Sequence, residues 1–286
     1  MKRLRLVSVL VVVTAVVLAG WPTGALAATQ PRLGTALNFA VLAGQTITNT
    51  GPTVITGNLG LSPGNASSVT GFPPGMVVNG QQHAADAVAL QAKNDLTTAY
   101  NDAASAPTTR SLTGQDLGGQ NLTAGVYTFT SSAQLTGPLT LSGSGVFIFK
   151  IGSTLTTASN SVVLLSQGAQ ACSVFWQVGS SATLGSATQF QGNLMALTSI
   201  TMVTGANILT GRALARNGAL TLDSNRITPP SGACATAPGV GLPGAGLPGA
   251  GGPPVRPGFP WLPAMVAGAI GALLFGLRFQ TTGKRS

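Results

Sequence analysis

The chain has 286 residues, a length that allows one sizeable domain together with targeting segments. Only 7% of the residues are charged, 39 are glycine and glutamate is absent, which favours a turn-rich, mainly β domain over a helical bundle. The net charge of +9 does not indicate nucleic-acid binding, because the basic residues between Ala28 and Ala235 are scattered and nearly balanced by aspartates.

Residues 1–27 have the pattern of a secretory signal peptide, which we expect to form a helix. Basic residues at the start precede an apolar run from Leu6 to Ala19, and the small-residue motif Ala25-Leu26-Ala27 predicts cleavage after Ala27. An uncleaved membrane anchor is the alternative interpretation. On either interpretation the following domain, residues 28–235, is exported.

The first part of this domain combines short strands with one helix. Thr46-Ile47-Thr48 and Val54-Ile55 have the β-branched composition of strands. From Gln81 to Ser105 apolar residues recur at steps of three and four, so we expect an amphipathic helix at about 82–105, packed along one side of the strands. Val88 belongs to this apolar stripe, which continues to Ala103, whereas Lys93 falls on the opposite, solvent-facing side. His83, near the start of this helix, is more typical of a surface or capping residue than of a catalytic one.

The second part repeats one short pattern four times, in which a threonine stands between two apolar residues or follows a small one. Repeats too short to bury a face alone are typical of a β-solenoid, with three short strands and tight corners in each coil. Because side chains alternate along a strand, we expect Leu155, Leu184, Met202 and Leu222 to be interior neighbours. The threonines should then form one outer column with a step of about 4.8 Å. They are Thr154, Thr183, Thr201 and Thr221.

Two explanations of this column stay open at the level of the sequence. The hydroxyls could pair between coils and stabilise the fold by about 0.2–1 kcal/mol for each pair. Alternatively, they could form a regular surface for a ligand.

Cys172 and Cys234 are the only cysteines, and the exported context predicts a disulfide between them. It would join the long connection in the second coil to the segment just after the last repeat, and so clamp that end of the solenoid. Two buried thiols are the alternative.

The C-terminal region differs from the domain in composition. Residues 236–260 form a linker rich in glycine and proline, which includes Leu247-Pro248-Gly249-Ala250-Gly251. Residues 261–278 are apolar enough for a transmembrane or sorting-signal helix, and the basic residues in 279–286 predict a cytoplasmic tail. The order of these three segments resembles a Gram-positive cell-wall sorting signal, although alanine occupies the position of the usual threonine. We therefore expect a protein anchored at the cell surface, by a sortase or by a retained membrane span.

Residues that could carry catalysis are few and dispersed. The only acidic residues are five aspartates, three of which fall on the predicted helix, and there is one histidine. No serine–histidine–aspartate arrangement, metal-ligand cluster or phosphate-binding loop is evident. The sequence predicts that the protein is not an enzyme and that it uses no cofactor and no metal.

Longer motifs resemble the bacterial and fungal ice-binding proteins that have a discontinuous β-solenoid. The resemblance covers about residues 33–229 and is carried most clearly by the segments 146–157 and 174–185, which read VFIFKIGSTLTT and VFWQVGSSATLG. It implies a right-handed, three-faced, discontinuous β-solenoid with one long α-helix packed alongside. It also implies binding to an ice crystal surface through one flat face.

Members of that family often carry the motif Thr-(Ala/Gly)-x-(Thr/Asn) on the binding face. Thr157-Ala158-Ser159-Asn160 and Thr204-Gly205-Ala206-Asn207 fit it, whereas the corresponding segments at 186–189 and 224–227 do not. Together with the threonine column, the resemblance implies the following residues as ice contacts: Thr154, Thr157, Asn160, Thr183, Ser186, Thr188, Thr201, Thr204, Asn207 and Thr221.

Three functions remain to be separated. The first is an exported, surface-anchored ice-binding protein that adsorbs to ice through a flat, threonine-rich face. The second is a cell-surface adhesion or carbohydrate-binding module, which would need a groove lined by residues such as Trp176 or Tyr127 to bind an extracellular glycan. The third, an enzyme acting on glycans, would need converging aspartates.

Overall fold

The computed structural model describes residues 28–231, which form a mainly β structure with one α-helix, as the sequence predicts. Three short 3-10 helices, η1 Gly34–Asn38, η2 Ala66–Ser68 and η3 Ala171–Ser173, complete the elements of this region. The strands form two sheets, one of seven strands and one of thirteen. Every strand pairing between named strands in the two sheets is parallel, as in a solenoid.

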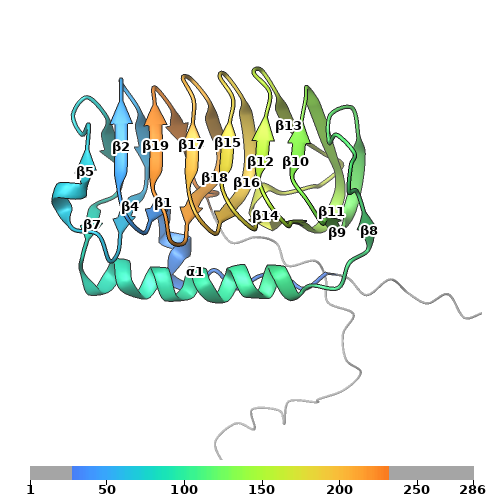
Figure 1. Cartoon of the computed structure of the whole chain (residues 1–286), viewed down its shortest axis with the longest axis horizontal. Coiled ribbons are helices and arrows are strands. Elements are labelled where there is room, and N and C mark those ends of the chain that lie inside the picture. Colours follow the sequence, from blue (N-terminus) through green and yellow to red (C-terminus); the bar gives the residue numbers. More distant parts are fainter. Residues whose placement is uncertain (1–27, 232–286) are drawn as a thin grey trace, which may run out of the picture. The chain divides into compact units, whose positions relative to one another are not determined.

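The seven-stranded sheet forms one wall of the solenoid, which we call the threonine wall (Figure 1). Its strands are short and alternate between buried and more exposed residues, which is the pattern predicted from the repeats. In spatial order they are β10 Ala133–Leu135, β12 Leu155–Thr157, β15 Ala182–Leu184, β17 Ile200–Met202, β19 Leu220–Asp223, β2 Ile47–Thr50 and β5 Val69–Thr70.

This order shows that the solenoid is discontinuous in the sequence. β19, from the last coil, pairs with β2 near the N-terminus, and β2 in turn pairs with β5. In the same way β1 Phe39–Ala43 lies between β18 Asn207–Ala215 and β4 Asn58–Leu61. The N-terminal coils therefore stack on the last coil of the chain. The helix separates the two groups of coils in the sequence, but in space it runs alongside them (Figure 1).

The thirteen-stranded sheet supplies the other two walls, because its long strands bend. β11 Pro138–Ile151 pairs with β9 Asn121–Phe129 on both sides of a register shift between Ser142 and Phe147, and β16 Gln189–Ala196 shifts against β18 after Phe190. The first halves of these strands form a bare wall with β13 Val162–Ser166, β20 Arg226–Ile227, β3 Val54–Thr56 and β6 Met76–Val78. Their second halves form a helix-covered wall with β14 Val174–Val178, β1, β4, β7 Gln82–Ala84 and β8 Arg110–Ser111.

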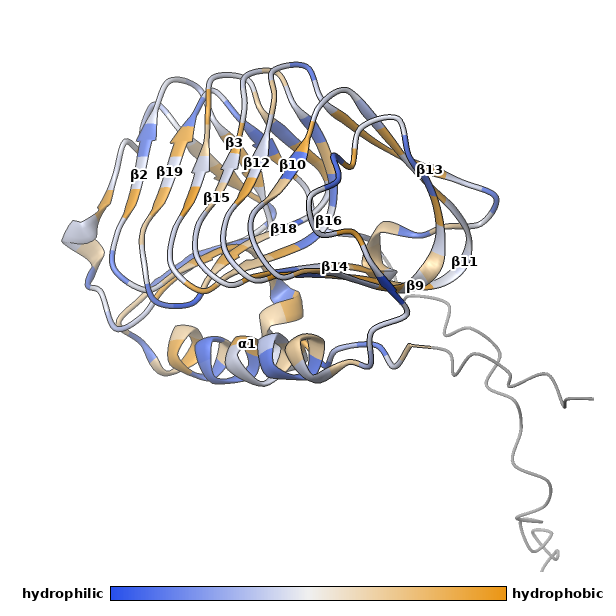
Figure 2. Ribbon diagram, turned by 45° about the vertical axis from the view of Figure 1, so that its right-hand side comes forward, coloured by the Kyte–Doolittle hydropathy of each residue, from blue (hydrophilic) through white to orange (hydrophobic). Residues whose placement is uncertain are grey.

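Helix α1, Ala87–Ser105, runs along the helix-covered wall (Figure 1). The strands that face it carry hydrophobic stretches (Figure 2), and a second hydrophobic cluster fills the space between them. From the helix this cluster takes Ala92, Leu96, Ala99, Tyr100 and Ala103, and from the strands Val126, Ile148, Phe175, Met195, Leu214 and Leu42. The helix thus buries an apolar surface that the wall would otherwise expose to water.

The helix starts later than predicted. Residues 82–84 pair with β4 as strand β7, and Asp86 caps α1 by accepting a hydrogen bond of 2.7 Å from the backbone N–H of Ala89. That bond is the main reason why the pKa of Asp86 lies below its ordinary value. His83 lies in β7 and contacts the capping carboxylate of Asp86 at 2.7 Å, so it supports the cap without capping the helix itself.

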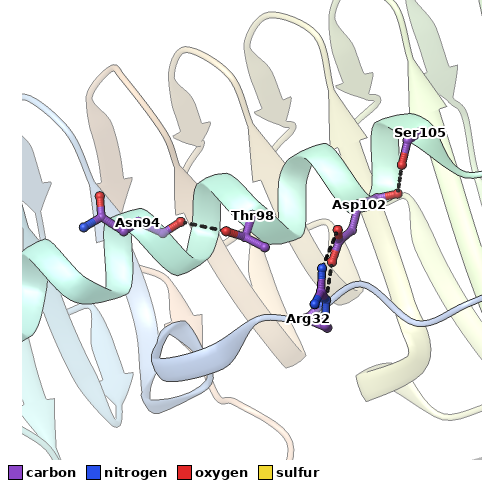
Figure 3. Close-up of polar contacts among 5 residues, drawn as sticks. All are labelled: Arg32, Asn94, Thr98, Asp102 and Ser105. Carbon is purple, nitrogen blue, oxygen red and sulfur yellow. Dashed lines mark hydrogen bonds and ion pairs between the residues drawn. The ribbon is translucent and has the colours of Figure 1, made fainter.

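The chain before β1 lies along α1 and is held by two aspartates of the helix. Arg32 bonds to Asp102 through its guanidinium Nε at 3.0 Å, as Figure 3 shows, and Thr35 donates from its backbone N–H and its hydroxyl to Asp95. These bonds lower the pKa of both carboxyl groups. The helix therefore contacts the wall with one side and this N-terminal segment with another.

The interior of the solenoid contains a stack of aromatic rings. Trp176 is fully buried, with its ring centroid 4.0 Å from that of Phe149 and 4.9 Å from that of Phe190. Its indole N–H donates to the carbonyl of Gln191 at 3.0 Å. Tyr127 continues the stack, 5.4 Å from Phe149. Such rings fill the wide interior of the coils and fix their spacing.

The corners of the coils need residues without a side chain at some positions. A Cβ atom on Gly179, where the chain turns into the threonine wall, would lie 2.5 Å from the carbonyl oxygen of Gly152 in the next coil. The close stacking of coils at this corner therefore requires glycine.

Several predictions fall on residues outside the described region. These are the signal peptide at 1–27, Cys234, the linker at 236–260, the apolar helix at 261–278 and the basic tail. Within residues 28–231 no helix has the length and apolar character that a membrane span requires. The disulfide between Cys172 and Cys234 stays a prediction.

Candidate functional site

One residue in each strand of the threonine wall points outward at the same register position. Six of the seven are threonines, and the pairing is unbroken from one end of the sheet to the other. In spatial order the residues of this central column are Gln134, Thr156, Thr183, Thr201, Thr221, Thr48 and Thr70. All of them are exposed or half-exposed, whereas the residues on either side in most of the strands are buried. The wall therefore presents a regular array of hydroxyl and methyl groups.

A second column of small residues, most of them serine or threonine, lies beside the first. The hydroxyl of Thr154 donates to that of Ser132 in the neighbouring coil at 2.9 Å. The corresponding residues of the following coils are identified by their backbone carbonyls, each of which accepts a hydrogen bond from the neighbouring coil. These residues are Ser181, Ser199, Ala219 and Thr46. The two columns together contain no charged residue and no aromatic residue.

The central hydroxyls are largely free of internal hydrogen bonds. Thr48 donates to Thr221 at 3.5 Å, which is the outer limit for such a bond. Across residues 28–231, the side-chain hydroxyls of Thr156, Thr183 and Thr201 make no hydrogen bond to another residue of the protein. These three threonines thus do not use the hydroxyl pairing that joins Thr154 to Ser132 in the neighbouring coil. Pairing between coils therefore does not explain why threonine recurs here.

The predicted column was partly wrong. Thr183, Thr201 and Thr221 share it, but Thr154 lies two residues earlier in its strand, beside Ser132. Thr156 takes the central position, and Leu155 accordingly pairs with Ala182 instead of Leu184. The segment around Thr154 contains two threonines at outward positions, and the sequence pattern selected the first of them.

Two predicted contacts are buried. Thr157 and Thr188 are 3% and 0% exposed, and their hydroxyls bond to each other at 2.7 Å inside a corner of the coil. Thr157 also accepts a bond from the backbone N–H of Gly185 at 2.9 Å. These residues hold neighbouring coils together from within and do not reach the surface of the wall.

Four other predicted contacts lie at the corner between the threonine wall and the bare wall. Asn160 adopts a positive φ of 60° in its turn, and its N–H donates to the carbonyl of Ser186. The hydroxyl of Thr204 donates to Asp223. The side-chain amide of Asn207 donates to the carbonyl of Gly205 at 2.9 Å. The residues of the family motif therefore lie in the turns that border the threonine wall, and none of them belongs to the central column.

Four residues of the column were not among the predicted contacts: Gln134, Thr156, Thr48 and Thr70. Thr46-Ile47-Thr48 has the same alternation as the later repeats, but its place beside β19 depends on the discontinuous order of the coils. The alternation in Thr46-Ile47-Thr48 is the sequence feature that could have identified Thr48 as a member of the column.

The groups that other functions would need are engaged elsewhere. Trp176 is fully buried and Tyr127 is 5% exposed, so neither lines a groove for sugars. The described residues contain no group of three or more side chains able to hold a metal ion. Each aspartate has a structural partner: Ala89 for Asp86, Thr35 for Asp95, Arg32 for Asp102, Gly118 for Asp116 and Thr204 for Asp223.

Comparison with known proteins agrees with this geometry. The sequence profile of the family described as Ice-binding-like matches residues 41–228, which is more than half of the chain. The chain belongs to this ice-binding-like family. Its members are ice-binding proteins and not enzymes, so the third function is excluded.

Individual members are similar over most of their length. The chain is 56% identical to an ice-binding protein of Nostoc sp. (strain HG1) over 232 residues, which cover 80% of this chain and 84% of the relative. A solved ice-binding protein from an Antarctic biological consortium superposes with a TM-score of 0.69 at 49% identity, covering 74% of this chain and 96% of that one. One from the Antarctic ascomycete Antarctomyces psychrotrophicus gives 0.68 at 41% identity, covering 71% and 100%.

Proposed function

We propose that the protein binds ice through the threonine wall, by adsorption and without catalysis. The observation that carries this proposal is the central column, in which threonines from non-consecutive coils share one unbroken register and keep their hydroxyls largely free of internal bonds, the one exception being Thr48 with Thr221 at 3.5 Å. The ice-binding proteins to which the chain is similar support the same conclusion.

The physical basis of the proposal is pre-organisation. The backbone of each inner strand is held by two neighbouring strands, and the side chains beside most of the threonines are packed in the interior, so the outer hydroxyls and methyls have fixed positions. A surface that is already ordered loses little entropy when it meets an ordered lattice of water. Methyl groups between the hydroxyls exclude loosely held water, and hydroxyls at regular intervals can take part in the hydrogen bonds of ice.

The direct test is thermal hysteresis, together with inhibition of ice recrystallisation. We expect the protein to show both activities and Thr201→Tyr to lose most of the hysteresis, because a ring at the centre of the wall holds its neighbours away from the crystal. The matched control is Thr140→Tyr, the same exchange at an outward position of the bare wall, which should keep the wild-type value. If the wild-type protein is inactive, or if both variants lose activity equally, the proposal is wrong.

We further propose that the protein is exported and anchored at the cell surface. Support comes from sequence alone: the signal-peptide pattern at 1–27, the apolar segment at 261–278 and the basic tail. Fractionation of cells should recover the protein in the membrane or cell-wall fraction, and deletion of residues 261–286 should release it into the medium. A sortase would leave it bound to the wall after detergent extraction, whereas a membrane span would not. Recovery from the cytoplasm contradicts both forms of the proposal.

A further inference from the structure

A pair of cations lies at the edge of the helix-covered wall. Lys93 points from α1 toward the end of β18 and is only 9% exposed, although the sequence pattern places it on the solvent side of the helix. Its ammonium group donates to the carbonyl oxygen of Ala215 at 2.6 Å and to that of Arg216. The ammonium carries one more N–H than these two bonds use.

Arg216 belongs to the same cluster. Its guanidinium carbon lies 4.7 Å from the centroid of the Tyr100 ring, two helical turns beyond Lys93. Its Nε is buried, and among residues 28–231 it has no hydrogen-bond partner. A buried N–H without an acceptor destabilises the folded state, so this group favours a ligand that can accept its hydrogen bond.

Neither cation has a counter-charge. In the described region the two ion pairs are Arg32 with Asp102 and His83 with Asp86, so Lys93 and Arg216 take part in none. Asp95, the other acidic residue of the helix, is engaged by Thr35. Burial, and next the charge of Arg216, lower the pKa of Lys93 to about 7, which agrees with a cationic environment that lacks an anion.

We propose that Lys93 and Arg216 form a binding site for a small inorganic anion, which bridges the free N–H of Lys93 and the Nε of Arg216. Such an anion supplies the missing acceptor, cancels the repulsion between the two cations and ties the helix to the end of β18. The proposal concerns this cluster alone and does not depend on the ice activity of the threonine wall.

The test uses inorganic phosphate as the probe and the full chain as the protein. A ligand that binds only the folded state raises Tm along a saturation curve. We expect a saturable rise of about 2–4 °C in the wild-type protein as sodium phosphate increases through the millimolar range. Arg216→Gln should remove this rise. Arg226→Gln, which changes an exposed arginine of the bare wall, should respond as the wild type does and reports any general salting-out effect.

A second variant covers the case in which Arg216→Gln does not fold. Lys93→Met keeps the length and apolar contacts of the side chain, and we expect it to lose the saturable rise as well. A rise that is linear in phosphate and equal in all variants would overturn the proposal, as would the absence of any rise in the wild type. Thr201→Tyr should bind phosphate normally, so failure of the ice proposal and failure of the anion proposal give different results.

Discussion

The threonine wall and the bare wall are built from the same coils, and neither is covered by the helix, yet their outer surfaces differ. The central column of the threonine wall is threonine at six of seven positions. A corresponding column on the bare wall reads Pro138, Val162, Gln189, Asn207, Arg226, Val54 and Met76. Stacking of coils therefore requires regular residues on the inside only, and it places no such demand on the outside.

The two walls do not differ in register. No shift interrupts the ladder of the threonine wall, and the bare-wall ladder from Pro138 to Met76 is continuous as well. β16 and β18 slip past each other only after Phe190, where they bend away from the bare wall, with Leu209 as the extra residue. Regular spacing is therefore common to both walls, whereas regular outward chemistry, which recognition of a lattice also requires, is present on the threonine wall alone.

The largest effect on ice activity should come from a bulky residue in an N-terminal coil of the threonine wall. We expect Thr48→Tyr to lower thermal hysteresis several-fold, about as much as Thr201→Tyr, because Thr48 lies in register with Thr221. Thr56→Tyr, on the bare-wall strand β3 that follows in the same coil, is the matched control and should retain activity. Equal activity of Thr48→Tyr and the wild type would show that the contact ends at β19.

An intermediate effect, on stability instead of ice activity, is expected from a substitution at the buried corner of the coil where Thr157 lies. Thr157→Val removes the acceptor for the Gly185 N–H and the bond to Thr188, so unfolding should become easier by about 1–3 kcal/mol. Chemical denaturation measures this difference. Hysteresis per folded molecule should stay at the wild-type value, and a large loss of activity in a folded Thr157→Val protein would contradict the buried position.

A smaller effect is expected from a variant that removes the hydroxyl of a wall threonine and keeps its methyl group, which distinguishes the contributions of the two groups. Thr183→Val keeps the shape of the side chain, and its hydroxyl has no partner within the described region, so stability should change by no more than about 0.5 kcal/mol. Hysteresis should fall, but by less than in Thr48→Tyr, because the spacing of the methyl groups is preserved. A loss as large as that of the tyrosine variants would show that the hydroxyls carry most of the contact.

The sequence predicted the type of fold better than the arrangement of its site. Alternation around Thr183, Thr201 and Thr221 was enough to place them on one wall, because period two is a local property of a strand. Thr156 was missed because Thr157, a polar residue, occupies an interior position and disguises the alternation. Thr48 and Thr70 were missed because their neighbours are distant in sequence, and no local pattern records which coils stack on which.

The helix shows the same limit of local sequence patterns, which do not record contacts with distant parts of the chain. The stripe of small residues from Ala92 to Ala103 was predicted correctly as the buried side of α1. Val88 was predicted to be part of it and is 48% exposed, while Lys93 was predicted to be solvated and is buried. Lys93 is buried because the carbonyls of Ala215 and Arg216 lie opposite it, and these come from the end of β18 and the residue after it, more than 100 residues away.

Substitution of Lys93 should have the smallest effect on ice activity and a clear effect on the pH dependence of stability. The pKa of Lys93 falls from 10.5 to about 7 on folding, so between these values the unfolded chain binds more protons than the folded one. Stability should therefore rise as the pH increases from 7 to 9, and Lys93→Met should lack this rise. Denaturation at both pH values in phosphate-free buffer measures the slope, and a Lys93→Met protein with the wild-type slope would contradict the assignment. Hysteresis should be the same in both proteins, because the helix-covered wall lies apart from the threonine wall that we propose to meet the ice.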